Sequence, residues 1–537
     1  MAGVTGCSMR GAGWVSARRG MGALGGGVLA LMAGATGAGA QTIDQSINDA
    51  VGAITAPFVG FIFSPLPGTT FPWIVLWLIT AAVVFTLYFG FVQLRGFGHA
   101  LALVRGTYDN AKDPGEVNHF QALSTALSGT VGLGNIAGVA VAVSIGGPGA
   151  TFWMILAGLL SMATKFTECT LGVKYRNEFA DGHVSGGPMY YLSKGLAARG
   201  MAVQGRIMAA VFAVFCVLGS FGAGNMFQAN QVHAQLVNIT GASESWLSGQ
   251  GWLTGLVLAV VVFSVIVGGI RSIAHFAERV VPLMAIIYCG AAITIIAMNA
   301  DKLPWAIGQI VSGAFTDTGV AGGMVGAIIQ GFRRATFSNE AGLGSAAIAH
   351  SAVRTKEPIT EGLVSLLEPF IDTVVICTCT ALVIVVTGVL QLDPATGLYV
   401  WNAEAGRIAT QGNLTGVELT SAAFESSFSW FPYVLAVAVI LFAFSTLVSW
   451  SYYGLKAWTY LFGEGRTRET TFNVIYCLMV IVGAAINLGH VIDFADAAIF
   501  SMALINITGL YIMMPEVKKD LASYLARLKS GEIHPVA

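Results

Sequence analysis

A glycine-rich polar run interrupts an otherwise apolar segment at residues 128–138, which read SGTVGLGNIAG. Each glycine inside a helix costs about 1 kcal/mol relative to alanine, so this run predicts that the helix breaks here. A break leaves backbone N–H and C=O groups unpaired, and hydrocarbon cannot satisfy them. At membrane depth it is tolerated where it is buried in protein or lines a cavity for an ion or polar solute. We therefore expect a binding site at residues 128–138.

The broken run can bind both an anion, through backbone N–H groups, and a cation, through oxygen atoms. Free amides at the start of the outer half-helix, near Gly132 and Gly134, favour a carboxylate because the positive end of the helix dipole lies there. Carbonyls freed at the end of the inner half-helix, near Gly129 and Thr130, can coordinate Na⁺, and the side chains of Thr130 and Asn135 add oxygen atoms. The alternative is that the glycines only allow close helix packing.

A second set of oxygen donors lies in the apolar segment 431–457. The hydroxyls of Ser445 and Thr446 can complete a Na⁺ shell with the carbonyls of the broken run. Trp450 lies four residues after Thr446, so the two share a helix face and Trp450 can cap a small apolar pocket. The alternative is that both hydroxyls bond to their own helix backbone.

Two further apolar segments supply candidate substrate contacts. In segment 207–235, Phe227 and Gln231 lie on one helix face and can face the pocket; hydrogen bonding between helices is an equal alternative. In segment 320–350, carbonyls near Ile328 and Ile329 are expected to meet a substrate ammonium group.

Charged residues inside apolar segments indicate functional sites because they are costly in a membrane. Glu368 and Asp372 share a helix face and can pair with Arg333 or Arg334 as a cytoplasmic gate, or pair only structurally. Glu340, within the second polar interruption, is a further gate candidate. Lys165 and Glu168 are three residues apart, and their spacing favours a local ion pair.

Composition indicates an all-α polytopic membrane protein. The 537 residues are 55% hydrophobic and only 10% charged, with a mean hydropathy of +0.73, whereas soluble domains carry about 25% charged residues. No P-loop, HExxH, GxSxG, haem or iron–sulfur pattern is present, which argues against an enzyme. The scattered cysteines are interpreted as packing residues, and no cofactor is expected beyond a coupling ion.

The N-terminus resembles a bacterial secretory signal peptide. Arg18 and Arg19 precede a small, apolar run at 22–37 and an Ala-Gly-Ala sequence at 38–40. This order of basic region, apolar core and cleavage site predicts removal of residues 1–40, which places Gln41 outside. The alternative is an uncleaved first helix.

About eleven apolar runs of spanning length follow. They occupy residues 72–94, 121–143, 150–172, 207–235, 252–270, 280–298, 320–350, 361–388, 431–457, 471–489 and 492–514. Alternation from an external Gln41 puts the C-terminus in the cytoplasm of a bacterium, with the chain in the inner membrane. Nearly all Lys and Arg after Gln41 then fall on cytoplasmic segments, as the positive-inside rule requires; Lys302, Arg407 and the intramembrane Lys165 are the exceptions.

The spans from 121 onward divide into five and five. An odd number per half inverts the second half relative to the first, so a second break is expected in the sixth core span. The apolar run 320–332 there is too short to cross and is followed by Arg333 and a polar stretch. Paired interruptions in two inverted halves indicate a central transport site. The chain is expected to divide into a signal peptide (1–40), an external segment with an extra transmembrane helix and a cytoplasmic linker (41–118), and a first five-helix repeat (119–300). A second, inverted five-helix repeat (301–515) and a cytoplasmic tail (516–537) are expected to follow.

Two loops complete the prediction. Residues 185–191 (SGGPMYY) are expected to form a surface turn that leads into an amphipathic helix through Arg199. Residues 391–428 are expected to form a polar external loop over the outer vestibule.

Several motifs resemble the alanine or glycine:cation symporter family, which has a leucine-transporter-like fold of the amino acid–polyamine–organocation superfamily. They are LSGTVGLGNIAG (127–138), GGPGA (146–150), MATKFTE (162–168), SGGPMYY (185–191), FSNEAG (337–342) and SWSYYG (449–454). The resemblance covers roughly residues 70–530. It implies a five-plus-five inverted repeat, Na⁺-driven uptake of small neutral amino acids, and a cation site between the first and eighth core helices, favouring Thr446 and Trp450.

The expected function is Na⁺-coupled symport of alanine or glycine by a monomer using alternating access. An H⁺-coupled symporter and a passive channel are the alternatives. A channel would repeat one selectivity filter symmetrically, whereas this chain has two unlike breaks. The sequence leaves open the preference for D-alanine, L-alanine or glycine, the coupling ion and its stoichiometry.

Overall fold

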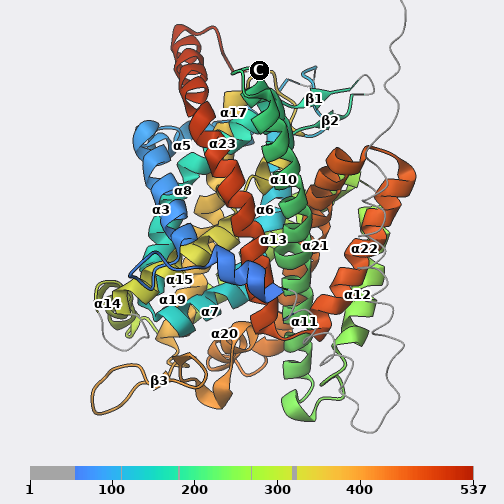
Figure 1. Ribbon diagram of the computed structural model, residues 1–537. Coiled ribbons are helices and arrows are strands. Elements are labelled where there is room, and N and C mark those ends of the chain that lie inside the picture. The colour runs from blue at the N-terminus through green and yellow to red at the C-terminus, as the bar shows by residue number, and fades with distance from the viewer. Residues whose placement is uncertain are drawn as a thin grey trace, which may run out of the picture.

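The computed structural model describes residue 52 and residues 55–110, 112–179, 182–267, 269–316 and 323–535. The predicted signal peptide lies outside this part of the chain. The described part is mostly helical, with two short antiparallel strand pairs. The strands are β1 (Asn177–Glu178), β2 (Val184–Ser185), β3 (Trp401–Asn402) and β4 (Arg407–Ile408). The pairs lie at opposite ends of the molecule, β1 and β2 near the top of Figure 1 and β3 near the bottom.

Within the described residues, seven helical stretches are long and apolar enough to cross a membrane, or eight with one bent pair. The long stretches comprise α8 (Gly149–Lys174), α10 (Ala202–Phe221) with η3 (Gly222–Met226) and α11 (Phe227–Ile239), α13 (Gly269–Met298), α17 (Pro358–Ser365) with α18 (Leu367–Pro369), η5 (Phe370–Cys377) and α19 (Thr378–Val386), α21 (Phe431–Phe462), α22 (Arg466–Ala485) and α23 (Leu488–Ser530).

Shorter helices accompany these stretches, apart from the two broken helices that are described below. They are α3 (Trp73–Tyr88), α4 (Val92–Arg95), α5 (Phe97–Val104), α9 (Pro188–Tyr190), η2 (Tyr191–Gly195), η4 (Ala242–Glu244), α12 (Gly251–Ile266), α14 (Leu303–Gly313), η6 (Gln411–Asn413) and α20 (Gly416–Glu425). A helix occupies each predicted apolar span. In Figure 1, α17 marks the upper end of the bundle and α20 the lower; these are called the α17 end and the α20 end below.

The first predicted break is confirmed. Helix α6 (His119–Thr130) begins with a capping box in which the Asn118 side chain accepts from the Gln121 amide. The helix ends before Val131, whose ψ of 88° is not helical. The π-helix η1 (Gly134–Gly138) and α7 (Val139–Gly146) then continue at 53° to α6. Every residue from 122 to 144 is buried, so the break faces protein.

The second break is also confirmed, but it lies later in the chain than the apolar run indicates. Helix α15 (Gly323–Asn339) continues through both arginines, and α16 (Ser345–His350) follows. Between them Glu340, Gly342 and Gly344 have φ of 57°, 86° and 82°. Positive φ is unfavourable for a non-glycine residue, so the contacts of Glu340 must hold it in place.

The expectation of a surface turn at 185–191 is wrong. Residues 185–189 are buried, and the glycines lie directly against α16. A methyl group added at Gly186 would lie 2.5 Å from Ser351 Cβ, and one at Gly187 would lie 2.7 Å from Ile348 Cγ1. Gly187 also has a φ of 110°. The small residues therefore serve close packing against the segment after the second break.

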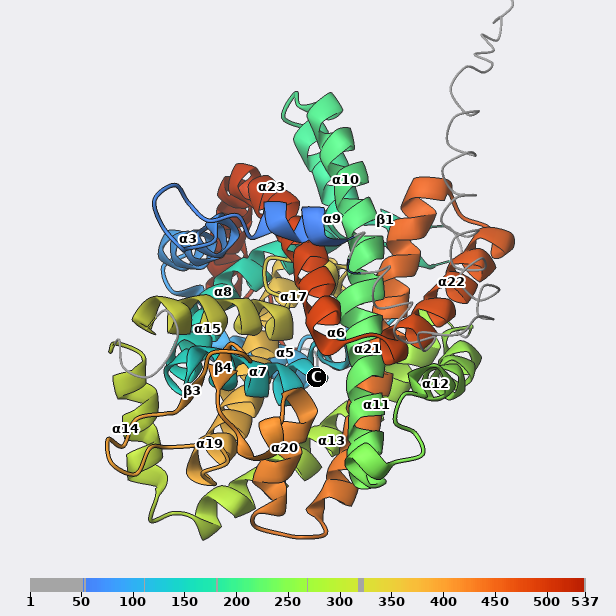
Figure 2. The same ribbon diagram turned by 60° about the horizontal axis from the view of Figure 1, so that its bottom comes forward.

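Both breaks lie in the middle of the bundle. Helix α6 packs on α13 and α21, α7 packs on α15, and α8 packs along α15 and α17. Helix α3 packs mainly on α8 and also contacts α15 and α23. Figure 2, which turns the α20 end forward, shows α7 and α20 close together there. The described fold thus brings two non-helical stretches to one level.

Close helix packing gives a testable consequence. A Cβ at Gly255 of α12 would lie 2.6 Å from Ile481 Cα of α22, and overpacking of this kind costs about 1–3 kcal/mol. We expect Gly255→Val to lower the thermal unfolding temperature of the detergent-solubilised protein. The matched control is Gly290→Val on α13, because a Cβ there meets no atom within 4 Å. Equal unfolding temperatures for the two variants would contradict this packing.

Candidate functional site

The two breaks meet at Gly134. A methyl group added there would lie 3.5 Å from both Phe337 Cδ1 and Ser338 Cα, the residues before the second break. The Phe337 ring packs edge-on against Phe227 of α11, with ring centroids 5.0 Å apart. The junction is therefore lined by glycine on one side and by aromatic rings on another.

Side-chain oxygens satisfy the amides freed by the first break. The Gly132 N–H donates to Asn135 Oδ1 at 2.9 Å, and the Leu133 N–H donates to Gln228 Oε1 at 3.2 Å. These bonds replace the missing helical bonds. A substrate carboxylate can take the same two donors when the amide side chains turn away.

Gln231 has a different position from the one expected. Its Oε1 accepts from the Val417 N–H of α20 at 2.9 Å, one helical turn closer to the α20 end than Gln228. The residue of α11 that reaches the break is thus Gln228, and Gln231 joins α11 to α20. Thr420 of α20 donates to the Ile136 carbonyl at 3.1 Å, so this helix covers the break from the α20 end.

Asp372 connects both breaks. Asn135 Nδ2 donates to Asp372 Oδ1 at 2.6 Å, and the Thr373 hydroxyl donates to Asp372 Oδ2 at 2.7 Å. Asn339 Nδ2 donates to Thr373 Oγ1 at 3.0 Å. Asp372 is buried, and neutral groups supply its hydrogen bonds among the described residues. An ionised carboxylate in such a place favours a cation beside it.

Helix α21 lies along the first break on its other side. Thr446 Oγ1 is buried without a hydrogen-bond partner in the described part of the chain, and a methyl group added at Gly132 would overlap it. Tyr453 OH is likewise buried and unpartnered, 2.9 Å from a methyl group added at Gly129. Buried polar atoms are normally satisfied, so these two hydroxyls point to a ligand between α6 and α21.

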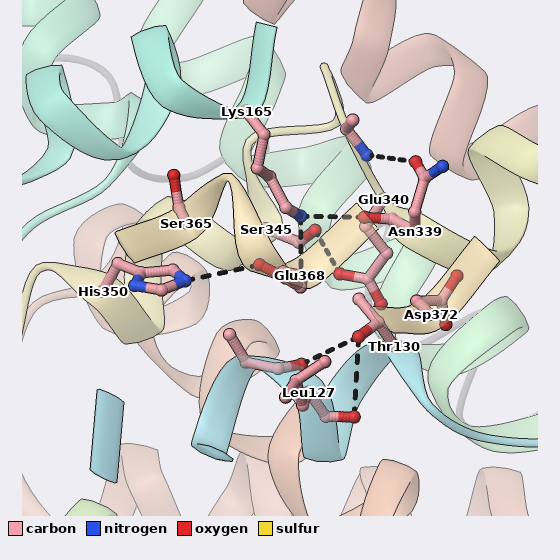
Figure 3. Close-up of polar contacts among 12 residues, drawn as sticks. Leu127, Thr130, Lys165, Asn339, Glu340, Ser345, His350, Ser365, Glu368 and Asp372 are labelled. Carbon is pink, nitrogen blue, oxygen red and sulfur yellow. Dashed lines mark hydrogen bonds and ion pairs between the residues drawn. The ribbon is translucent and has the colours of Figure 1, made fainter. Parts of the chain in front are cut away.

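The neighbouring hydroxyls bond to their own helices. Thr130 Oγ1 donates to the Ala126 carbonyl at 3.3 Å (Figure 3 shows it turned toward its own helix). Ser445 Oγ donates to the Phe442 carbonyl at 2.9 Å. The Ser445 carbonyl in turn accepts from Ser128 Oγ at 2.9 Å.

Trp450 and Glu340 form one unit. Trp450 Nε1 donates to Glu340 Oε1 at 2.7 Å, and Ser345 Oγ donates to Glu340 Oε2 at 2.5 Å. A methyl group added at Gly224 of η3 would overlap the indole ring. Trp450 is therefore held between α10–α11 and the second break, and Glu340 lies at the centre of the bundle.

The predicted partners of the two arginines are wrong. Arg333 Nη2 lies 2.8 Å from Asp496 Oδ2 of α23, and Arg334 contacts the same oxygen. Both lie on the α15 side of the second break, toward the α20 end, whereas Glu368 lies beyond it. The countercharge for these intrahelical arginines comes from a helix more than 150 residues later, which no local spacing reveals.

Ile328 and Ile329 do not reach the junction. They are half-buried in α15, and Ile329 is separated from Glu340 by a helical rise of roughly 16 Å. The carbonyls that the second break frees belong to residues near Asn339, because α15 runs further than the apolar run alone indicates.

Sequence reasoning missed several residues at the junction. Ser338, Asn339 and Tyr453 lie inside the FSNEAG and SWSYYG motifs, and their presence there was the available signal. Cys377 Sγ accepts from Asn135 Nδ2 at 3.3 Å, and nothing in its sequence surroundings distinguishes it from the packing cysteines.

Sequence relatives of known type match most of the chain. The sodium/alanine symporter AgcS of Methanococcus maripaludis is 37% identical over 454 residues, covering 84% of this chain and 94% of that protein. The probable sodium/glutamine symporter GlnT of Bacillus subtilis is 32% identical, covering 86% of this chain and 89% of that protein. The crystal structure of MhsT in complex with L-phenylalanine matches with a TM-score of 0.50 at 14% identity, covering 73% of this chain and 88% of that chain.

The structural likeness shows a leucine-transporter-like fold, which fits the two broken helices that meet in the bundle. Relatives at this identity and coverage are transporters and not enzymes. Residues 58–537 match the sodium:alanine symporter family, and the chain therefore belongs to that family.

Proposed function

We propose that this transporter uses an inward Na⁺ gradient to carry a small neutral amino acid, alanine or glycine, into the cell by alternating access. The observation that carries the proposal is the unpartnered Thr446 hydroxyl facing Gly132 between α6 and α21. A hard cation is the ligand that such hydroxyls and freed carbonyls suit. The names of AgcS and GlnT support Na⁺ as the coupling ion.

The proposed architecture is a pair of inverted five-helix repeats. The first runs from α6 to α13 and the second from α15 to α23, with α3 outside them, which gives eleven crossings after a cleaved signal peptide. The concentration of Lys and Arg at the α17 end supports a cytoplasmic position for that end and for the C-terminus in a bacterium. The chain then lies in the inner membrane, and we propose that it acts as a monomer.

The substrate carboxylate is proposed to bind the amides of Gly132 and Leu133, in place of the Asn135 and Gln228 oxygens. Its ammonium group is proposed to face Asp372, a buried carboxylate beside the same amides. Gly134 and Trp450 then limit the side chain to a small one. This assignment replaces the carbonyls near Ile328, which lie too far along α15.

Na⁺ is proposed to bind between α6 and α21. Backbone oxygens near Gly129 and Thr130, together with Ser445 and Thr446, supply its ligands, and the Tyr453 hydroxyl lies beside them. A membrane potential of 100 mV adds about 2.3 kcal/mol per charge to the driving force. Arg333 and Arg334, which tie α15 to Asp496, are proposed to close the α20 end.

Reconstituted protein tests the function directly. Proteoliposomes loaded without Na⁺ are expected to accumulate labelled alanine above the external concentration when Na⁺ is added outside, and unlabelled alanine inside is expected to speed entry of label. Empty liposomes provide the control. Accumulation that follows a pH gradient and ignores Na⁺ would favour the H⁺-coupled alternative, and flux without trans-stimulation would favour a channel.

Thr446→Ala tests the ion site. Removing the hydroxyl is expected to raise the Na⁺ concentration for half-maximal uptake about tenfold or more, because a contact to a charged group contributes about 1.5–3 kcal/mol. The matched control is Thr459→Ala on the same helix, whose hydroxyl donates to the Lys456 carbonyl at 3.2 Å and whose Na⁺ dependence should equal the wild type. The Na⁺ dependence of initial uptake rates is the measurement; an unchanged value in Thr446→Ala removes Thr446 from the site.

A further inference from the structure

A chain of alternating acidic and basic side chains runs from the loop before α6 to the second break. Its members, called the acid–base chain below, are Asp109, His119, Glu361, His350, Glu368, Lys165 and Glu168. Figure 3 shows its inner part, where His350 faces Glu368 and Lys165 lies between Glu368 and the backbone of the second break. The proposed Na⁺ and substrate contacts use none of these residues.

The outer part of the acid–base chain joins α6, from the first broken helix, to α16, from the second, at the α17 end. Glu361 of α17 accepts on its two oxygens from two histidines: His119 Nδ1 of α6 contacts Oε2, and His350 Nδ1 of α16 lies 2.5 Å from Oε1. The other ring nitrogen of His119 lies 3.8 Å from Asp109 Oδ1. The Glu361 carboxylate thus connects the two broken helices at their α17 ends.

The inner part of the chain reaches the second break itself. His350 Nε2 lies 3.3 Å from Glu368 Oε2, and Lys165 Nζ lies 3.0 Å from Glu368 Oε1. Lys165 also donates to the Asn339 carbonyl at 2.9 Å, and its distance to Glu168 is 3.9 Å. The local pair expected from sequence is therefore the longest of these Lys165 contacts.

The contacts of His350 can be made only if the site holds enough protons for two hydrogen bonds. A neutral imidazole carries one N–H, and its other nitrogen is a lone pair. Both nitrogens of His350 face carboxylates, so hydrogen bonds on both sides need one more proton, on the ring or on a carboxyl group. Without that proton, a nitrogen lone pair faces a carboxylate oxygen at one of the two contacts. The site therefore holds a proton whenever both contacts are made.

Charge balance leads to the same requirement. Lys165 is the one permanently cationic member, against the buried carboxylates of Glu168, Glu361 and Glu368, and Glu340 lies nearby. Uncompensated buried charge is costly, so protons on the histidines reduce the excess of negative charge. The other ionisable groups that interact with the cluster are Asp372, Arg176, Cys169, Tyr191 and Tyr453.

Among the described residues, the acid–base chain is exposed to water at one end. The side chains from His119 to Glu168 are at most 2% exposed, whereas the Asp109 side chain is 34% exposed. Asp109 Oδ1, the oxygen nearest His119, is buried, so a proton exchanges with the aqueous phase at the α17 end through the exposed remainder of the Asp109 side chain, without crossing the substrate junction.

We propose that the acid–base chain is a proton-binding site that holds the α17 end of the transporter closed, and that loss of its proton to water at that end releases α6 and α16. With the proton bound, both histidines donate to carboxylates on α17 and α18. With the proton lost, a lone pair opposes a carboxylate and the buried negative charge grows, and opening relieves both by admitting water. The proton is a ligand additional to Na⁺; only the sign of its effect on uptake rests on the proposed inward release of substrate at this end.

Hydrogen–deuterium exchange of the full-length protein in nanodiscs, without substrate, tests the proposal independently of transport. Protection of residues 345–350, corrected for intrinsic exchange and compared with α12, is expected to fall as pH rises from 6 to 9, by at most about tenfold per pH unit because one proton is linked. His350→Gln removes the titrating group and should abolish this pH response; His119→Gln, tested in parallel, should weaken it. His534→Gln, at an exposed tail histidine, should retain the wild-type response.

A response of equal size in wild type, His350→Gln and His119→Gln overturns the proposal, as does a wild type without any response. A second arm measures Na⁺-driven alanine uptake with internal pH varied at fixed external pH. Faster uptake at high internal pH in wild type, with no such dependence in His350→Gln, supports the proposal. If no Na⁺-driven uptake occurs but the exchange response is present, the proposed function fails and the proton site stands.

Discussion

Unpaired backbone groups in the middle of a bundle must be satisfied by protein or by a ligand, and this constraint determines how the two breaks are built. The first break is satisfied by neutral amides: Asn135 and Gln228 accept from the freed N–H groups. The second is satisfied by charged groups as well as amides: Lys165 donates to the Asn339 carbonyl and Glu168 accepts from the Gly344 N–H, while the Asn339 side chain accepts from the Ala341 N–H. Both bonds to the N–H groups of the first break come from neutral amides, which exchange partners more easily than the buried charges at the second break, so the first break is better suited to bind a changing ligand.

The charged side chains explain why the second break can exist at all. Glu340 has a positive φ, and its carboxylate is fixed by Trp450 and Ser345. Asn506 of α23 adds a bond to the Gly342 carbonyl at 2.9 Å. Helices α8, α21 and α23 therefore each contribute a polar contact to five irregular residues. Such a segment is stable only as part of the whole bundle, which makes it sensitive to movement of any one of these helices.

The sequence predicts the position of both breaks because glycine clusters and a short apolar run are local signals. It fails where the partner is distant. Arg333 indicates the end of a membrane span when only the sequence is considered. In the structure Asp496 pairs with it, so α15 continues past Arg333 and the break lies later than expected. Helical periodicity places Gln231 on the same face of α11 as Phe227. The position of a residue along the helix axis, however, decides whether it contacts the first break or α20. Gln228 lies at the level of the break, whereas Gln231 lies at the level of α20. Periodicity therefore predicts which face of a helix a residue lies on, but not which neighbouring segment that residue contacts.

Helix α21 connects the two breaks mechanically. Thr446 faces Gly132 of the first break, and Trp450, one turn further on the same helix face, bonds Glu340 in the second. The helix is continuous from Phe431 to Phe462, so a ligand that pulls Thr446 toward α6 also moves the indole that holds Glu340. Coupling between two ligands requires an element that both of them bias. A rigid α21 with one contact to each break is such an element, and it relates an ion at Thr446 to the shape of the second break without any contact between ion and Glu340.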